Sequence, residues 1–425
     1  MDSFEIHSLF SNQQHLKKYL KKDLVRVYDP AVVNGTSRLK FTCHGLTTKL
    51  MNYSEGFLLV TGYIHSTDAG NALANNDIVS IQNGSNSLFI DAKLSFNNNQ
   101  VEHNIRPDIS TTWVNLLLIY SPDYASSIAV QWAFVKDAAL DGPNNDDVAK
   151  LRAAIGGANL ATVTAAAGTL PARFECRFMI PLAYLFQFVR RLSFPLINQL
   201  VEIELTLNET GCIFRNGAHP SAFVMTDAQM LIPEVVLPTP DNTKLMKSLA
   251  SNNFTKTLEW DSMEYQRTNR PVAANVPFNE LIDANLTGIR KIYFLVHANF
   301  NSQEHVQTGS AIAIRDFNVE INSRDLYNMN IATDQEAYRL LSDNFNSQGQ
   351  DVNTGSLLPY TEWILRYRVY VLDLNRQEEF ESDPNAAQSI RIRGTPNAAG
   401  RLVIILAKNR VTRIDMANPQ NTKTI

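Results

Sequence analysis

Two neighbouring carboxylates have the type and spacing that catalysis could use. Glu202 and Glu204 are two residues apart in a segment where apolar and polar residues alternate. In a β-strand, residues at this spacing project from the same face, as two carboxylates must for general acid–base catalysis. The same pattern is typical of a polar strand face that contacts solvent or a neighbouring subunit, and we favour that interpretation.

The histidines and cysteines do not form a metal-binding or nucleophilic pattern. A cupin-type enzyme holds its metal with a closely spaced His-x-His and Glu set, and the sequence has no such set. His65 and His297 occupy matching positions near the ends of two predicted strands, and we interpret both as ordinary strand residues. Cys43 and His44 are adjacent, so in a strand their side chains point to opposite faces. The three cysteines lie far apart without a CxxC pair, which favours reduced thiols in a cytosolic or nuclear environment.

The remaining candidates favour structural roles. Asp373 and Arg376 are spaced to form a local ion pair at the end of a strand. Four tryptophans are expected to anchor a core or an interface: Trp113, Trp132, Trp260 and Trp363. The sequence contains no Walker A, GxGxxG, HExxH or GxSxG motif. We therefore predict no catalytic, cofactor-binding or metal-binding residues, and we expect that the protein is not an enzyme.

The bulk composition is that of an ordinary globular protein. Of the 425 residues, 44% are hydrophobic and 19% are charged, and a chain of this length can bury a large core without disulfides. The net charge of −4, with lysines and arginines scattered, argues against a surface that binds nucleic acid throughout. The N-terminus lacks a signal-peptide core, and no apolar run approaches the ~20 residues that span a bilayer.

Strands dominate the predicted secondary structure, because apolar residues recur with a period of two. The alternation is plainest at residues 201–207 and 365–371. Other strands are predicted at residues 39–50, 57–66, 77–82, 87–97, 174–180, 222–231, 255–266, 290–298, 311–322, 363–372, 389–393 and 401–408. Asn83-Gly84 predicts a tight hairpin turn. Helices are predicted after Pro181, within residues 148–163, and after the capping box of Thr333 and Glu336.

The two halves of the chain look like versions of one plan. Residues 83–97 and 308–322 match at a constant offset of 225 (309 − 84). The identical residues in this match are Gly84 with Gly309, Asp91 with Asp316, and Asn97 with Asn322. Upstream, residues 63–65 resemble residues 295–297 at an offset of 232 (297 − 65). This repetition indicates a duplicated β unit.

Two serial β units predict an all-β fold of two tandem jelly rolls, each an eight-stranded β-sandwich, with a few short helices and long loops. The predicted divisions are an N-terminal arm (1–38), a first jelly roll (39–232) with a long loop (121–173), a linker (233–254), a second jelly roll (255–408) and a loose C-terminal tail (409–425). The linker is placed where three prolines gather. Because β–α alternation is missing, a doubly wound α/β sheet is disfavoured.

Three segments resemble the double jelly-roll major capsid proteins of the polinton-type, virophage and adenovirus hexon lineage. One is FECRFMIPLAYLFQFVRRLSFPLINQLVEIELTL at residues 174–207, which reads as a strand, a Pro-led helix and an alternating strand. Another is VLDLNRQ at residues 371–377, and the third begins with TLEW at residue 257 and runs to residue 279. With the repeat, the resemblance covers about residues 39–408.

The resemblance implies a structural protein of a double-stranded DNA virus or virus-like element. Each chain would supply two jelly rolls standing side by side, and three chains would form a homotrimer with a six-lobed outline that tiles an icosahedral shell. The implied partners are other copies of the chain, minor capsid or vertex proteins, and an inner membrane or the genome through the N-terminal arm. No cofactor and no small-molecule substrate are implied. The implied location is the virion, assembled in the cytoplasm or nucleus of the host cell.

Three other functions stay open at this point. A carbohydrate- or receptor-binding β-sandwich, such as a spike or lectin, would present a shallow aromatic site. A non-virion scaffold of the same fold would form lattices on membranes. A bicupin-type enzyme would require a metal.

Overall fold

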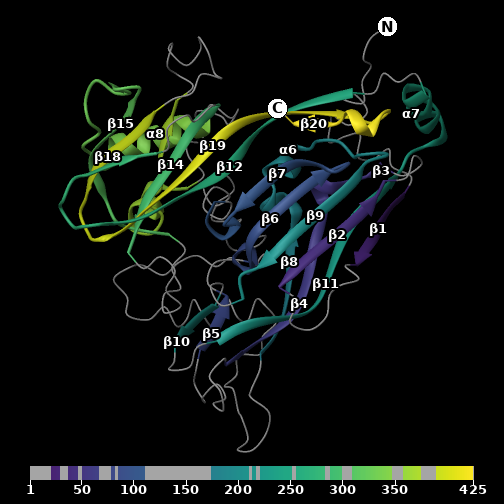
Figure 1. Ribbon diagram of the computed structural model, residues 1–425, viewed down its shortest axis with the longest axis horizontal. Helices are drawn as coiled ribbons and strands as arrows, with labels where there is room; N and C mark the ends of the chain where they lie inside the picture. Colours follow the sequence, from purple (N-terminus) through teal and green to yellow (C-terminus); the bar gives the residue numbers. More distant parts are fainter. Residues whose placement is uncertain are drawn as a thin grey trace, which may run out of the picture.

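The structure is a computed structural model in which two β-sandwich units lie side by side (Figure 1). It describes residues 21–28, 37–45, 50–66, 78–81, 85–110, 174–209, 213–216, 221–250, 255–282, 288–298, 309–346, 358–374 and 389–424. The predicted turn at Asn83-Gly84, the long loop 121–173 and the helix within 148–163 lie outside these residues, as do Trp113 and Trp132.

The first unit consists of two antiparallel sheets around a shared core. One sheet has the strand order β1-β11-β4-β8, with β3 also paired to β11, and the other has the order β2-β9-β6-β7. The strands are β1 (Lys21–Tyr28), β2 (Arg38–His44), β3 (Leu50–Met51), β4 (Phe57–Ser66), β6 (Phe89–Phe96), β7 (Asn99–Ile105), β8 (Phe174–Pro181), β9 (Leu200–Leu207) and β11 (Ser221–Val236). A separate two-stranded sheet pairs β5 (Ile78–Ile81) with β10 (Ile213–Asn216).

The second unit repeats this design around its own core. Its sheets have the orders β12-β19-β14-β17, with β20 also paired to β19, and β13-β18-β15-β16. The strands are β12 (Thr255–Val272), β13 (Phe278–Leu281), β14 (Ile289–His297), β15 (Ile314–Ile321), β16 (Arg324–Asp325), β17 (Tyr370–Asp373), β18 (Ile390–Pro396), β19 (Gly400–Asp415) and β20 (Lys423–Thr424).

The two units have the same topology. If the eight main strands of each unit are numbered in chain order, leaving out β3, β5, β10 and β20, both units have one sheet in the order 1-8-3-6 and one in the order 2-7-4-5. An eight-stranded sandwich in which the first strand pairs with the last, and the second with the seventh, is a jelly roll. The predicted fold class, two tandem jelly rolls, is therefore confirmed.

The sequence repeat falls on equivalent strands. β6 and β15 are the fourth main strands of their units, and their first residues differ by 225 (314 − 89). β4 and β14 are the third, and their first residues differ by 232 (289 − 57). The hairpin after the fourth strand also matches, since Asn97 and Asn98 have positive φ in one unit, and Asn322 and Ser323 in the other. Positive φ at both central residues is the geometry of a type I′ turn, which suits the twist of the strands it joins.

Helices are few among the described residues, and the longest, α8, has 13 residues. They are α5 (Leu182–Leu185), α6 (Gln187–Arg191), α7 (Thr239–Ala250), α8 (Asp334–Asn346) and α9 (Tyr360–Leu365), with 3-10 turns η2 (Tyr53–Glu55), η3 (Ser85–Leu88) and η5 (Pro419–Asn421). The predicted capping box begins α8: Thr333 N donates to Glu336 Oε2 at 3.0 Å, and Glu336 N donates to Thr333 Oγ1 at 3.3 Å. The single helix predicted after Pro181 is instead two helices, because Phe186 between them has extended backbone.

Three predicted segments contain regular structure that the sequence did not indicate. Residues 21–28 of the predicted arm form β1, which pairs with β11 along its whole length. In the predicted linker, β11 continues through Pro233 to Val236, and α7 follows. In the predicted loose tail, β19 continues to Asp415, and η5 and β20 follow it. The division of the chain into domains stays a prediction, but these segments belong to the folded units.

The strand predicted at residues 363–372 was wrong in its first part. Residues up to Leu365 form α9, and β17 begins only at Tyr370. The helix begins after Pro359, which suits a helix N-terminus, and Glu362 pairs with Arg366 one turn later at 2.7 Å. Every residue from Tyr367 to Leu372 is buried. The apolar–polar alternation in the sequence therefore does not correspond to one buried face and one solvent-facing face of a strand.

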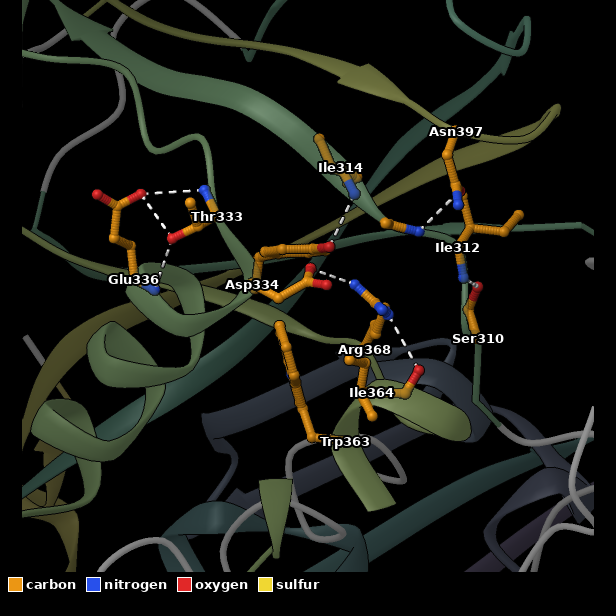
Figure 2. Close-up of polar contacts among 12 residues, drawn as sticks. Ser310, Ile312, Ile314, Thr333, Asp334, Glu336, Trp363, Ile364, Arg368 and Asn397 are labelled. Atoms are coloured by element: carbon orange, nitrogen blue, oxygen red, sulfur yellow. Dashed lines mark hydrogen bonds and ion pairs between the residues drawn. The ribbon is translucent and has the colours of Figure 1, made fainter. Parts of the chain in front are cut away.

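A buried arginine connects both helices of the second unit to its core. Figure 2 shows Arg368 pointing toward the carboxylate of Asp334 in α8, with the ring of Trp363 beside it. Its Nε donates to the carbonyl oxygen of Ile364 at 3.0 Å, and its guanidinium lies 5.3 Å from the Trp363 ring centre. A charge-assisted bond and a cation–π contact therefore hold α8 and α9 in place.

Candidate functional site: the junction between the two units

A ribbon of two long strands joins the units. β12 and β19 pair along almost their full length, from Thr255 opposite Asp415 to Val272 opposite Gly400. Figure 1 shows the ends that lie nearest the C-terminus extending over the first unit. Trp260 of β12 and Ile414 of β19 are buried within the core of the first unit.

Trp260 is the main apolar contact of the junction. Its ring packs edge to face against Phe188 of α6, with the ring centres 5.7 Å apart. Its indole Nε1 donates to Thr412 Oγ1 at 2.9 Å, so the polar atom of the buried ring is satisfied. In the opposite direction, Ile109 of the first unit is buried in the core of the second. The two cores interlock, and this fixes the units against each other.

A strained turn positions Ile109. Arg106 has a φ of 58°, a conformation that residues other than glycine rarely adopt. Its guanidinium binds the Asp108 carboxylate through Nε and Nη2, at 2.9 and 2.7 Å to the nearer oxygens. The main-chain N–H groups of Ile109 and Ser110 donate to Arg106 O. This bidentate ion pair and the two main-chain bonds stabilise the turn, so that Arg106 retains its unfavourable backbone conformation.

The C-terminal segment, residues 415–424, is tied to the first unit by buried amides. Gln199 is 1% exposed, donates through Nε2 to Asp415 O at 3.0 Å, and accepts from Thr422 Oγ1 at 3.2 Å. Asn97 Nδ2 donates both to Gln199 Oε1 and to Pro419 O. Since buried amides are costly to leave unpaired, these bonds specify one position for the segment.

A buried carboxyl group lies at the same junction. Glu102 of β7 is 2% exposed and accepts from Phe188 N at 2.8 Å, Gln187 N at 3.0 Å and Asn104 Nδ2 at 2.9 Å. Burial raises the pKa of this carboxyl to about 7, although the three N–H donors oppose the rise.

Charged groups from both units meet nearby. Lys291 of β14 is 4% exposed, and burial lowers its pKa while Asp373 and Asp261 act in the opposite direction. Burial raises the pKa of Asp261, and this rise is opposed by Lys291 and by Arg191 of α6. Arg191 belongs to the first unit, so the junction also contains electrostatic contacts across the two units.

The two carboxylates considered in the sequence analysis, Glu202 and Glu204, form surface ion pairs. Lys40 of β2 lies between Glu202 and Glu204 of β9, with its Nζ 3.0 and 3.3 Å from their carboxylate oxygens. The register places Lys40 directly opposite Glu204 on the outer face of the sheet. Surface ion pairs of this kind contribute little stability and perform no chemistry by themselves.

The other sequence candidates are not brought together. Cys43 is buried and His44 exposed, so the predicted opposite orientation is confirmed. His65 lies beside the Tyr63 ring in β4, while His297 is buried in β14. Trp260 and Trp363 are buried anchors as predicted. Arg376 lies outside the described residues, so its predicted ion pair with Asp373 stays a prediction.

The part of the chain that the structure describes contains no group of three or more His, Cys, Asp or Glu side chains arranged to hold a metal ion. None of its helices is long and apolar enough to cross a membrane. The expected absence of catalytic, cofactor-binding and metal-binding residues stays a prediction.

Sequence reasoning singled out Trp260 but missed the polar role of the residues around it. Glu102 and Gln199 have no motif and no periodic signature, and Asn97 was found only as part of the repeat. All three acquire their role at the junction through partners far away in the chain.

No family model and no curated protein sequence matches this chain. Solved structures resemble it over most of its length. A chain in the cryo-EM structure of the Sputnik virophage matches with a TM-score of 0.60 at 11% identity, covering 96% of this chain and 89% of that one. The chain has the double jelly-roll fold.

Two further structures share the double jelly roll. The mavirus major capsid protein matches with a TM-score of 0.53 at 10% identity, covering 95% of this chain and 90% of that one. The Faustovirus major capsid protein also has a TM-score of 0.53, at 8% identity, covering 92% of this chain and 90% of that one. At these identities the likeness concerns the fold.

Proposed function

We propose that this chain is the major capsid protein of an icosahedral double-stranded DNA virus or virus-like element. The observation that carries the proposal is the duplicated topology, 1-8-3-6 and 2-7-4-5 in both units. Double jelly rolls of this kind are found in the mavirus and Faustovirus major capsid proteins. In this role the protein acts by binding other copies of itself and needs no cofactor.

Three copies form the building block. A closed trimer of chains with two similar lobes has an outline of six lobes, and such an outline packs hexagonally into flat facets. The interlocked cores of the junction support this, because a six-lobed outline requires a constant angle between the two lobes of each chain. Minor capsid or vertex proteins, and contacts of the N-terminal arm with a membrane or genome, stay predictions from the sequence.

Measuring the mass of the purified full-length protein in solution tests the proposal. We expect a species of about 143 kDa, three times the 47.7 kDa chain, that persists on dilution and assembles further at higher concentration. Trp260→Ala should reduce the trimer fraction, because it loosens the junction. Thr333→Ala is the matched control, since it weakens an exposed helix cap and leaves the junction contacts intact.

A stable 47.7 kDa monomer at high concentration would contradict the proposal. Saturable binding to a glycan array by that monomer would instead favour a carbohydrate-binding sandwich. Lattices that form only on added membranes, without closed particles, would favour a scaffold of the same fold.

A further inference from the structure

Glu102 is a buried acid whose oxygens meet only N–H donors. Its donors are the main-chain N–H groups of Gln187 and Phe188 and the amide of Asn104. None of the described lysine, arginine or histidine side chains forms an ion pair with it. A carboxylate without a counter-ion is disfavoured away from water, and this effect of burial outweighs the three N–H bonds that favour the ionised form.

The amide that donates to Glu102 also carries an unsatisfied acceptor. Asn104 Oδ1 is buried and has no hydrogen-bond partner among the described residues. It belongs to the same amide whose Nδ2 donates to Glu102 Oε1 and to Leu185 O. The polar contacts around Glu102 therefore leave one buried acceptor unsatisfied.

Glu102 is connected to the second unit through one aromatic contact. Phe188, whose N–H binds the carboxyl group, packs its ring against Trp260. β7, which carries Glu102, also lies against β12 and β20 of the second unit. A change in the position of Glu102 therefore acts on α6 and on the contact between the units.

The junction contains a cavity next to Glu102. A cavity of about 350 Å³ lies between the units and is lined by Glu102 and His103 on one side and by Glu264 and Arg410 on the other. The remaining lining residues are Gln100, Val101, Ile105, Ser262, Met263 and Thr424.

The other charged groups around the cavity are placed differently. His103 pairs with Asp91, which also contacts Lys93, and these side chains are partly exposed on the outer face of the sheet. Glu264 pairs with Lys408. Arg410 is exposed. Arg190 and Arg191 of α6 lie toward the charged cluster of the second unit, where they act on Tyr293 and on Asp261.

We infer that Glu102 is a proton-controlled latch between the two jelly rolls, closed when the acid is neutral and released when it is ionised. In the closed state the acid lies between β7 and α6, and Phe188 stays against Trp260. Ionisation draws water from the cavity to the carboxylate and loosens α6 from the ribbon of β12 and β19. This device goes beyond the proposed shell function and does not depend on it.

The pH range follows from the pKa, which burial raises from an ordinary 4.5 to about 7 in the closed state. Because the closed state holds its proton more tightly, closure is fully favoured below pH 4.5 and weakens as the pH rises toward 7. Linkage between these two values predicts that the open-to-closed ratio increases about tenfold between pH 6 and pH 8.

Hydrogen exchange of the full-length protein tests the latch on a single chain. After correction for intrinsic rates, we expect the amides of α6, including Gln187 and Phe188, to lose protection about tenfold between pH 6 and pH 8. Glu102→Gln keeps the shape without the charge and should abolish the change. His103→Gln is the matched control, because it removes the neighbouring titratable side chain. This variant should keep the pH-dependent change in protection.

Protection that does not change with pH in the wild-type protein would overturn the inference. A tenfold loss of protection between pH 6 and pH 8 in Glu102→Gln would also overturn it, as would the absence of this loss in His103→Gln. If Glu102→Gln does not fold, the wild-type protein and His103→Gln decide: the change must be present in both. The readout needs no trimer, so its failure is distinct from failure of the proposed shell function.

Discussion

Replacing Trp260 with alanine should uncouple the two jelly rolls. Trp260 is 2% exposed, belongs to the second unit and is buried in the core of the first. Truncating a buried tryptophan to alanine destabilises a core by about 3–5 kcal/mol. Thr412 keeps its contact with Thr424 after the indole is removed, so no orphaned hydroxyl adds to this loss. We therefore expect Trp260→Ala to lower the free energy of unfolding by about 4 kcal/mol.

Urea denaturation followed by circular dichroism measures the total loss, and hydrogen exchange locates it. Trp260→Phe keeps an aromatic ring without the N–H donor, so it should lose only about 1–2 kcal/mol. Trp363→Ala is the matched control: this tryptophan is 0% exposed but lies in the core of the second unit. It should cause a similar loss while residues 416–424 stay protected, whereas Trp260→Ala should expose them. A loss below about 1 kcal/mol for Trp260→Ala, or unchanged protection of this segment, would refute the interlocked junction.

Three other substitutions give separate tests. Gln199→Leu should lower the free energy of unfolding by about 2–3 kcal/mol, because it leaves several buried polar groups unpaired. It should also make the C-terminal segment sensitive to protease, and an unaltered digestion pattern would argue against the amide network. Arg368→Ala removes the partner of Asp334 and should lower the free energy of unfolding, measured by urea denaturation, by about 2–3 kcal/mol. An unchanged free energy of unfolding would contradict the anchoring role of Arg368. Thr333→Ala should cost about 1 kcal/mol. The pKa of Glu336 is lowered mainly by its bond from the Thr333 N–H, so the capping box should weaken as the pH falls below 4.5. A thermal-melting difference between wild type and Glu336→Gln that does not shrink at low pH would count against it.

The strands with one buried face could be predicted from the sequence. β4 has the predicted bounds, and in β9 the residues Val201, Ile203 and Leu205 are buried as their spacing predicts. The repeat could also be found, because β6 and β15 both have 8 residues and are followed by turns of the same geometry. These features are local, so a period of two or a shared turn residue, Asn97 and Asn322, is enough to reveal them.

The remaining strands were harder because tertiary contacts determine them. β14 is buried on both faces, and β13 and β16 are too short to show a period. β12 and β19 extend beyond their own sandwich because the first unit supplies a second core for their ends. Two bonds of Gln199 join it to residues more than two hundred positions away, Asp415 (216 positions) and Thr422 (223 positions), and no local pattern encodes such partners.

Electron microscopy of the purified protein tests the central claim most directly. If duplicated jelly rolls with interlocked cores build a shell, class averages must show a three-fold particle with six similar lobes, and concentrated samples must show these particles in hexagonal arrays. Isolated two-lobed particles at every concentration, or a variable angle between the lobes, would contradict the account.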